Sequence, residues 1–227
     1  MRHSRSSLIL SLLLAAVCAG CGRGTDDDRA TERAEVTTTP AEAVTPNAPQ
    51  GPIQAVIRTP QGDFTIELRH EAAPVSCANF VNLVNRDFFD GLPFYRHSTV
   101  IRQVGNPHGD ETRAWEPGYR LSPEFSPDLK FDRGGMVGMV RVADDVRAPV
   151  RANEFFVTTK PQSERFTFVY PIFAEVVDGQ SMVNAIRKGE KILDIEIRGD
   201  PTPLLAEHAD LIEEWNRRLD ATPDPRD

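Results

Sequence analysis

The sequence predicts a mostly-β domain in which short antiparallel strands close into a barrel capped by two helices, with an extra helix at the C-terminus. Three observations lead to this prediction. Short apolar runs recur between residues 53 and 198, only two interior segments show helical spacing, and a further helical stripe follows residue 203. Many short strands with few helices are typical of sandwiches and barrels.

The first strands and the first helix are predicted from local patterns. Residues 53–58 and 64–68 alternate apolar and polar side chains around a Pro-Gln-Gly-Asp turn, which predicts a β-hairpin. Pro74 suits a first helical turn, and the apolar spacing that follows predicts a helix over 74–86. Further strands are expected at 94–96, 100–104, 136–142, 155–158, 172–177 and 191–198, with a second helix at 181–188.

The segment after Pro203 has one apolar stripe at helical spacing, which predicts a C-terminal helix within residues 201–227. The stripe either packs on the barrel or docks a partner. Its members are Leu204, Leu205, His208, Leu211, Ile212, Trp215 and Leu219.

The composition limits the function classes. The chain has 227 residues, 40% of them hydrophobic, and a formal net charge of -8. An acidic chain without a dense basic stripe is a poor ligand for nucleic acid, so no nucleic-acid partner is expected. The five histidines are scattered and two of the three cysteines lie near the N-terminus, so we expect no metal and no cofactor. We expect a monomer.

The N-terminus is predicted to be a targeting signal. Arg2 and Arg5 precede an apolar stretch at 8–17 that is too short to span a bilayer. The following Cys-Ala-Gly-Cys21 resembles a bacterial lipobox, with Cys18 in place of the usual leucine. The resemblance implies a signal peptide over 1–20 and lipidation of Cys21; the alternative is an ordinary secretory signal cleaved nearby.

Residues 21–50 are predicted to be a disordered tether, because they contain almost no large apolar side chain. The tether would hold a domain spanning 51–200 at the cell envelope, anchored to the membrane by lipid and facing the periplasm. Gly22 stands where inner-membrane retention signals have an acidic residue, which favours the outer membrane.

Six short segments carry a family resemblance. In chain order they are GDFTIEL at 62–68, APVSCANF at 73–80, FDGLPFYR at 89–96, VIRQVGNP at 100–107, NEFFV at 153–157 and YPIFAEVVDG at 170–179. In their order and spacing they resemble the cyclophilins, a family of peptidyl-prolyl cis-trans isomerases. The resemblance covers about residues 53 to 198 and implies the cyclophilin-like barrel.

The resemblance also implies a site for X–Pro bonds of exported polypeptides. Arg96 matches the family's catalytic arginine, and Gln103 matches a residue that bonds the peptide backbone and holds the arginine. The substrate-binding positions implied by the matches are Phe94, Val100, Ile101, Val140, Arg141, Phe156, Phe166 and Tyr170.

Several positions depart from the family pattern. Val100 replaces a phenylalanine, Arg141 an asparagine and Glu154 a glutamine, and Arg165 stands nearest to the family's rim tryptophan. We expect Glu154 to pair with Arg141 or Arg96. Two alternatives to catalysis follow: a binder or holdase of proline-containing segments, and a structural envelope lipoprotein that docks partners through its C-terminal helix or residues 108–133.

Overall fold

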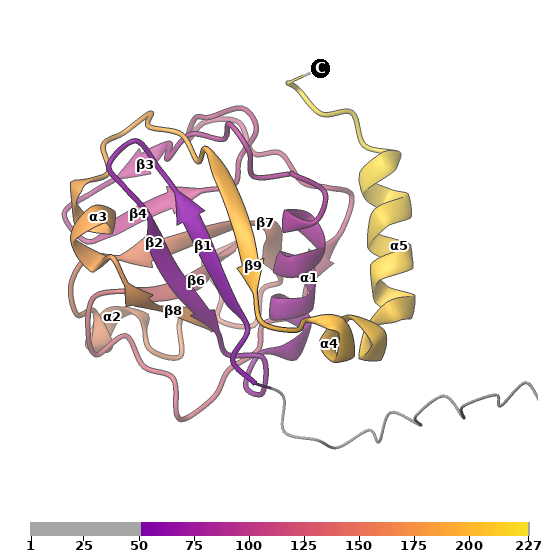
Figure 1. Cartoon of the computed structure of the whole chain (residues 1–227), viewed down its shortest axis with the longest axis horizontal. Helices are drawn as coiled ribbons and strands as arrows, with labels where there is room; N and C mark the ends of the chain where they lie inside the picture. Colours follow the sequence, from indigo (N-terminus) through magenta and orange to yellow (C-terminus); the bar gives the residue numbers. More distant parts are fainter. Residues whose placement is uncertain (1–50, 227) are drawn as a thin grey trace, which may run out of the picture. The chain divides into compact units, whose positions relative to one another are not determined.

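A computed structural model describes residues 51–226, and its framework is one antiparallel sheet of nine strands that curls round on itself (Figure 1). The strands are β1 (Gln54–Arg58), β2 (Phe64–Leu68), β3 (Arg96–His97), β4 (Ile101–Val104), β5 (Arg120–Leu121), β6 (Met136–Arg141), β7 (Val150–Thr158), β8 (Ile172–Asp178) and β9 (Asp194–Arg198). They pair in the order β3-β4-β7-β6-β8-β2-β1-β9, and β5 pairs with β7 beside this path.

The two ends of the sheet meet through the segments that precede β3 and β9. Phe94 donates its backbone N–H to the carbonyl of Glu190 at 2.8 Å, and Ile192 donates to the carbonyl of Leu92 at 3.0 Å. These bonds satisfy backbone groups that an open edge would expose. The predicted mostly-β antiparallel barrel is therefore confirmed.

The hairpin of β1 and β2 follows from its alternating residues. Ala55 lies opposite Ile66, and both are buried, while the polar neighbours of Ile66 in β2, Thr65 and Glu67, are half-buried. Gly62 in the turn has φ of +115°, a conformation that glycine adopts at low cost, and its N–H donates to Thr59.

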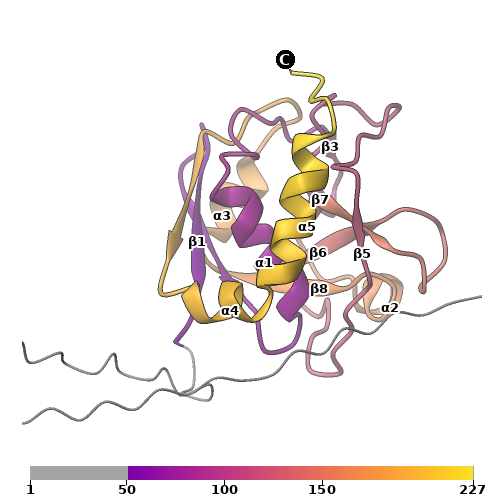
Figure 2. The same cartoon turned by 90° about the vertical axis from the view of Figure 1, so that its right-hand side faces the viewer.

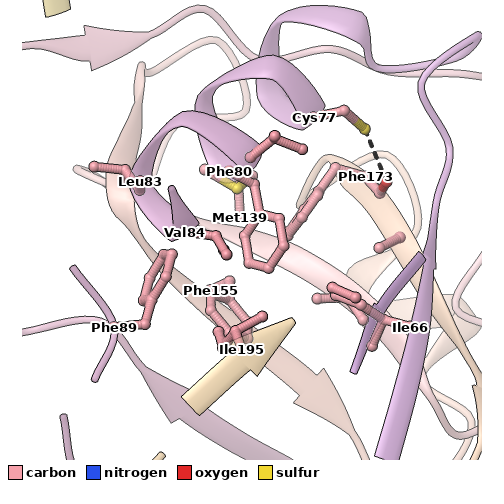
Figure 3. Close-up of a cluster of buried hydrophobic side chains, with 14 of the residues drawn as sticks. Ile66, Cys77, Phe80, Leu83, Val84, Phe89, Met139, Phe155, Phe173 and Ile195 are labelled. Carbon is pink, nitrogen blue, oxygen red and sulfur yellow. Dashed lines mark hydrogen bonds between the residues drawn. The ribbon is translucent and has the colours of Figure 1, made fainter. Parts of the chain in front are cut away.

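Helix α1 (Pro74–Val84) packs against one side of the barrel core. Its Phe80 and Val84 point toward Phe155 of the sheet, and its Cys77 points toward Phe173 (Figure 3). The Cys77 thiol bonds the carbonyl of Phe173, and burial raises its pKa, with Glu124 adding to the effect. Cys77 is therefore a core thiol.

A distant carboxylate caps α1, because Ala73 at the N-cap offers no side-chain acceptor. Glu124 accepts hydrogen bonds from the N–H groups of Val75 and Ser76, at 3.0 and 2.8 Å, and from the Ser76 hydroxyl. These bonds satisfy donors that a helix start leaves free, and the negative charge suits the positive end of the helix dipole.

The C-terminal segment forms two helices rather than the single one predicted. Helices α4 (Thr202–Glu207) and α5 (Ala209–Asp220) are separated at His208, whose backbone leaves the helical region. Helix α5 lies alongside α1 in both views (Figure 1, Figure 2). Trp215 of α5 is buried and stacks on Tyr119, which lies in the loop before β5. The apolar stripe packs inward, except Leu211, which is 43% exposed.

The remaining elements differ from the predictions mainly at their ends. Helix α3 (Gln180–Ala185) is shorter than predicted, and the one-turn helix α2 (Ser163–Phe166) and the strand β5 were not predicted. The predicted signal peptide, Cys21 and the tether lie outside the described residues. Within residues 51–226, no helix is long and apolar enough to cross a bilayer.

Candidate active site

One row of residues crosses five neighbouring strands and forms the base of the site. Arg96 lies opposite Gln103, Gln103 opposite Phe156, Phe156 opposite Gly138, and Gly138 opposite Ile172. Residues directly opposite each other in a sheet point to the same face. This row therefore faces outward, whereas the next residue of β7, Phe155, points into the barrel core (Figure 3).

The row borders a groove of about 430 Å³ on the outer face of the sheet. All the predicted site residues except Phe94 line it, namely Arg96, Gln103, Val100, Ile101, Val140, Arg141, Phe156, Phe166 and Tyr170. The matched segments therefore meet in space although they are up to 74 residues apart in the chain (96 to 170).

Aromatic rings form the floor and one wall of the groove. Phe131 stacks beneath Phe156 with a centroid distance of 5.8 Å, and Phe166 and Tyr170 meet the Phe156 ring edge-on. Edge-to-face packing at these distances fixes the orientation of each ring. The result is a rigid apolar surface, of which Phe166 and Tyr170 remain partly exposed.

Gly138 makes room for this stack. A Cβ at this position would lie 2.6 Å from Cζ of Phe156 and 2.9 Å from Cζ of Phe131. Such contacts are shorter than van der Waals distances, so a side chain here would push the floor ring into the groove. The glycine therefore helps to set the depth of the pocket.

Arg96 stands at the rim of the groove with its charge accessible. Its side chain is 52% exposed, its Nη1 donates to Oε1 of Gln103 at 3.3 Å, and its Nε lies 3.5 Å from Oε2 of Glu111. An exposed ion pair at this distance is weak. The guanidinium is therefore oriented by Gln103 and free to donate to a bound ligand.

Gln103 connects Arg96 to a buried carboxylate. Its Nε2 donates to the Tyr95 hydroxyl and, at 3.1 Å, to Oε2 of Glu154. Tyr95 in turn donates to the same carboxylate oxygen at 2.5 Å. The predicted pairing of Glu154 with Arg96 or Arg141 is therefore wrong: the nearest guanidinium is that of Arg151, at 3.8 Å.

Burial raises the pKa of Glu154, and the hydrogen bonds from Tyr95 and the charge of Arg151 only partly offset this effect. The side chain is buried and its ion pair with Arg151 is long, so the charged form is poorly compensated. Burial likewise raises the pKa of Tyr95, which stays a hydrogen-bond donor at physiological pH.

This carboxylate gives a pH-dependent stability. The folded protein holds the Glu154 proton more tightly than the unfolded chain, so stability is full below the ordinary pKa of 4.5 and declines as pH rises through the raised value. The side chain introduced by Glu154→Gln cannot ionise. We therefore expect the free energy of unfolding of this variant to fall less with rising pH than that of the wild type. Urea unfolding of both proteins from pH 4 to 8 measures it.

The same substitution at the exposed Glu164 controls for net charge. Parallel curves for wild type and Glu154→Gln would mean that the carboxylate ionises as it does in the unfolded chain.

Arg141 lies inside the groove. Its guanidinium carbon is 4.6 Å from the Tyr170 ring centroid, and its Nη2 contacts Asp144 at 3.0 Å. Arg165, at the position nearest the family's rim tryptophan, lines the same groove. The two arginines give this wall a positive charge where the aligned positions predict an amide and an aromatic ring.

Phe94 was predicted to touch substrate, and the structure shows otherwise. Its side chain is fully buried in the barrel core. The reason is that the backbone around Phe94 pairs with residues 189–192 to close the barrel, which turns the ring inward. In its place, Phe131 and Met136 support the groove from below.

Sequence patterns did not single out Phe131, Met136 or Gly138. Phe131 lies in the irregular segment before β6, so no periodicity marks it. The local sequence offers one signal, the three glycines at 134, 135 and 138. Glycine within a strand often marks a place where another group approaches the backbone closely. No three metal-ligating side chains cluster among residues 51–226.

The structure is thus a curled antiparallel barrel whose outer face presents an aromatic floor beside an arginine that Gln103 orients. The family model for cyclophilin type peptidyl-prolyl cis-trans isomerases matches residues 54–202. This chain belongs to that family, and its enzyme class is that of a cyclophilin-type peptidyl-prolyl isomerase.

Relatives and solved structures agree with this assignment. A peptidyl-prolyl cis-trans isomerase of Synechococcus elongatus is 31% identical over 150 residues, which cover 65% of this chain and 97% of that protein. Isomerase B of Bacillus subtilis is 30% identical over 134 residues, covering 59% and 89%. A putative thylakoid lumen isomerase of Synechocystis is 28% identical, covering 66% and 48%.

A cyclophilin-type isomerase of Cryptosporidium parvum superposes with a TM-score of 0.59 at 25% identity, covering 66% of this chain and all of that one. A second structure of it, in the presence of the dipeptide Ala-Pro, gives a TM-score of 0.58 at 25% identity, covering 65% and 99%.

Proposed function

We propose that the groove binds X–Pro segments and accelerates their cis–trans isomerisation, with Arg96 acting on the imide nitrogen. The barrier to rotation comes from amide resonance and is about 18–20 kcal/mol, so unaided isomerisation takes tens to hundreds of seconds. A group that stabilises only the twisted state, in which the nitrogen lone pair is localised, lowers this barrier.

In this proposal each part of the site has a role. The proline ring packs on Phe156, between Phe166 and Tyr170, where apolar burial holds it. Arg96 lies two strands away from Phe156, about 10 Å across the sheet at the usual strand spacing, within reach of a long side chain. Its guanidinium stays charged at any working pH and offers several donors.

One observation supports this proposal most strongly. Arg96 is half exposed at the rim of the groove and is oriented by Gln103, rather than being buried against Glu154. A guanidinium neutralised by a buried carboxylate would have little charge to direct at the substrate. The Cryptosporidium relative, solved in the presence of Ala-Pro, supports proline-containing peptides as the ligand class.

Exchange NMR on a short X–Pro peptide tests the proposal with the full-length protein. We expect cis–trans exchange to quicken in proportion to the protein added. Shifted peptide peaks without faster exchange would show a binder instead, and an absence of both would exclude the groove as a peptide site.

Binding without catalysis is the second candidate, and one observation favours it. Both donors of the Gln103 amide are used inside the protein, by Tyr95 and Glu154, so this side chain is less available to a peptide backbone. The exchange experiment separates the two candidates directly.

We further propose that the substrates are exported polypeptides and that the protein is lipid-anchored at the cell envelope, facing the periplasm. The Cys-Ala-Gly-Cys21 segment after a short apolar stretch supports this, and so does a relative named for the thylakoid lumen. Replacing Cys21 by serine should release the protein from the membrane fraction, whereas Cys18→Ser should not. Equal membrane retention of both variants would contradict the anchor.

A further inference from the structure

The groove is positively charged although the chain is acidic. Three guanidinium groups line it, those of Arg96, Arg141 and Arg165, against a single carboxylate, Asp144. The chain as a whole has a net charge of -8. A local positive charge raises the concentration of negatively charged ligands at the groove, even on an acidic protein.

Arg141 is the most deeply placed of the three. Its side chain is 6% exposed, and its guanidinium carbon lies 4.6 Å from the Tyr170 ring, whose centroid is 5.3 Å from that of Phe156. The Arg141 guanidinium is therefore separated only by the Tyr170 ring from Phe156, on which the proline ring is proposed to pack. Adjacent residues are 3.8 Å apart along a chain, so a side chain next to proline can reach it.

The charge of Arg141 is poorly compensated within the protein. Its carboxylate partner, Asp144, is 101% exposed and lies in the loop between β6 and β7, so the pair is weak. Its Nε is buried and has no hydrogen-bond partner among residues 51–226. A desolvated cation with an unused donor gains more from a second carboxylate than an exposed one does.

We propose that the groove selects proline peptides that carry a carboxylate side chain on the residue directly before the proline, and that Arg141 is the residue that determines this preference. The inference rests on the proposed function and specifies its substrate class. The bound carboxylate accepts from the Arg141 guanidinium where it lines the groove and competes with Asp144 for its charge. Apolar contact with the floor supplies the affinity for proline, and the arginine discriminates among its neighbours.

The test compares three peptides that differ only at the residue before proline, Glu, Gln or Lys, in exchange NMR with the full-length protein. A charge-assisted hydrogen bond predicts a roughly fivefold to twentyfold higher kcat/KM for Glu–Pro than for Gln–Pro. Lys–Pro should be the slowest, and the Glu preference should shrink as salt is added.

Arg141→Met keeps the aliphatic stem and removes the charge, so the Glu-to-Gln ratio should fall toward one. Asp144→Asn removes the competitor and should raise the ratio. Arg147→Met removes an exposed charge from the same loop, outside the groove, and should leave the ratio unchanged. A wild-type ratio near one, or a ratio that persists in Arg141→Met, would overturn the inference.

Failure of catalysis remains distinguishable from failure of this inference. If no peptide exchanges faster, the proposed isomerase activity is wrong, and the chemical-shift titrations of the same samples still give the ratio of dissociation constants for Glu and Gln peptides. Tighter binding of the Glu peptide that is lost in Arg141→Met supports the inference, and equal binding overturns it.

Discussion

Replacing Arg96 by alanine should lower kcat/KM for an X–Pro peptide by about 100-fold or more, the usual effect of removing one preorganised donor to a transition state. The side chain is half exposed and makes one weak ion pair, so its loss should leave the fold intact. The measurement is the cis–trans exchange rate against protein concentration, with a thermal melt of the same sample.

Arg120 offers a matched control, because its side chain is 49% exposed and it also pairs with one carboxylate, Glu116. Arg120→Ala should keep the wild-type rate. Arg96→Lys should recover part of the loss, since it keeps the charge but not the planar fork that Gln103 orients. A loss of less than about threefold in Arg96→Ala would remove Arg96 from the catalytic role proposed, given the size expected for such a donor.

Replacing Trp215 by alanine should destabilise the protein by about 3–5 kcal/mol, the usual cost of deleting a large buried aromatic side chain. The indole is 4% exposed and stacks on Tyr119 with a centroid distance of 5.6 Å. Removing it opens a cavity between α5, α1 and the loop that carries Tyr119. Urea unfolding of wild type and variant measures the change.

Leu211→Ala is the control, because Leu211 lies on the same helix but is 43% exposed. It should change the stability by less than about 0.5 kcal/mol. If Trp215→Ala were equally mild, α5 would contribute little to the fold and would be free to dock a partner. The folded Trp215→Ala protein should accelerate cis–trans exchange of an X–Pro peptide about as much as the wild type, since no residue of α5 lines the groove.

Short apolar runs predicted most of the barrel, although only β2 shows a regular alternation of buried and half-buried residues. Phe155 and Phe156 show the limit of this signal: both are apolar, yet one fills the core and the other forms the floor of the groove. Only the register with β4 and β6 decides which is which, and register depends on residues far away in the chain.

The site residues were predicted by motif similarity, and this explains where the prediction failed. Phe94 belongs to a matching segment, but the motif does not say which way the ring turns when the barrel closes. Glu154 was recognised as unusual, yet its true partners, Tyr95 and Gln103, follow from packing between β7 and the segment around β3. Elements of two to four residues, such as β5 and α2, are too short to show any periodicity.

The exchange rate of an X–Pro peptide at saturating concentration, measured on wild type and Arg96→Ala, tests the central claim most directly. Saturation separates catalysis from binding, because every groove is occupied in both proteins. The structure predicts rapid exchange on the wild type and slow exchange on the variant, with similar peptide shifts, since the aromatic floor is unchanged. Equal exchange on both proteins, or slow exchange on both, would contradict the role assigned to Arg96.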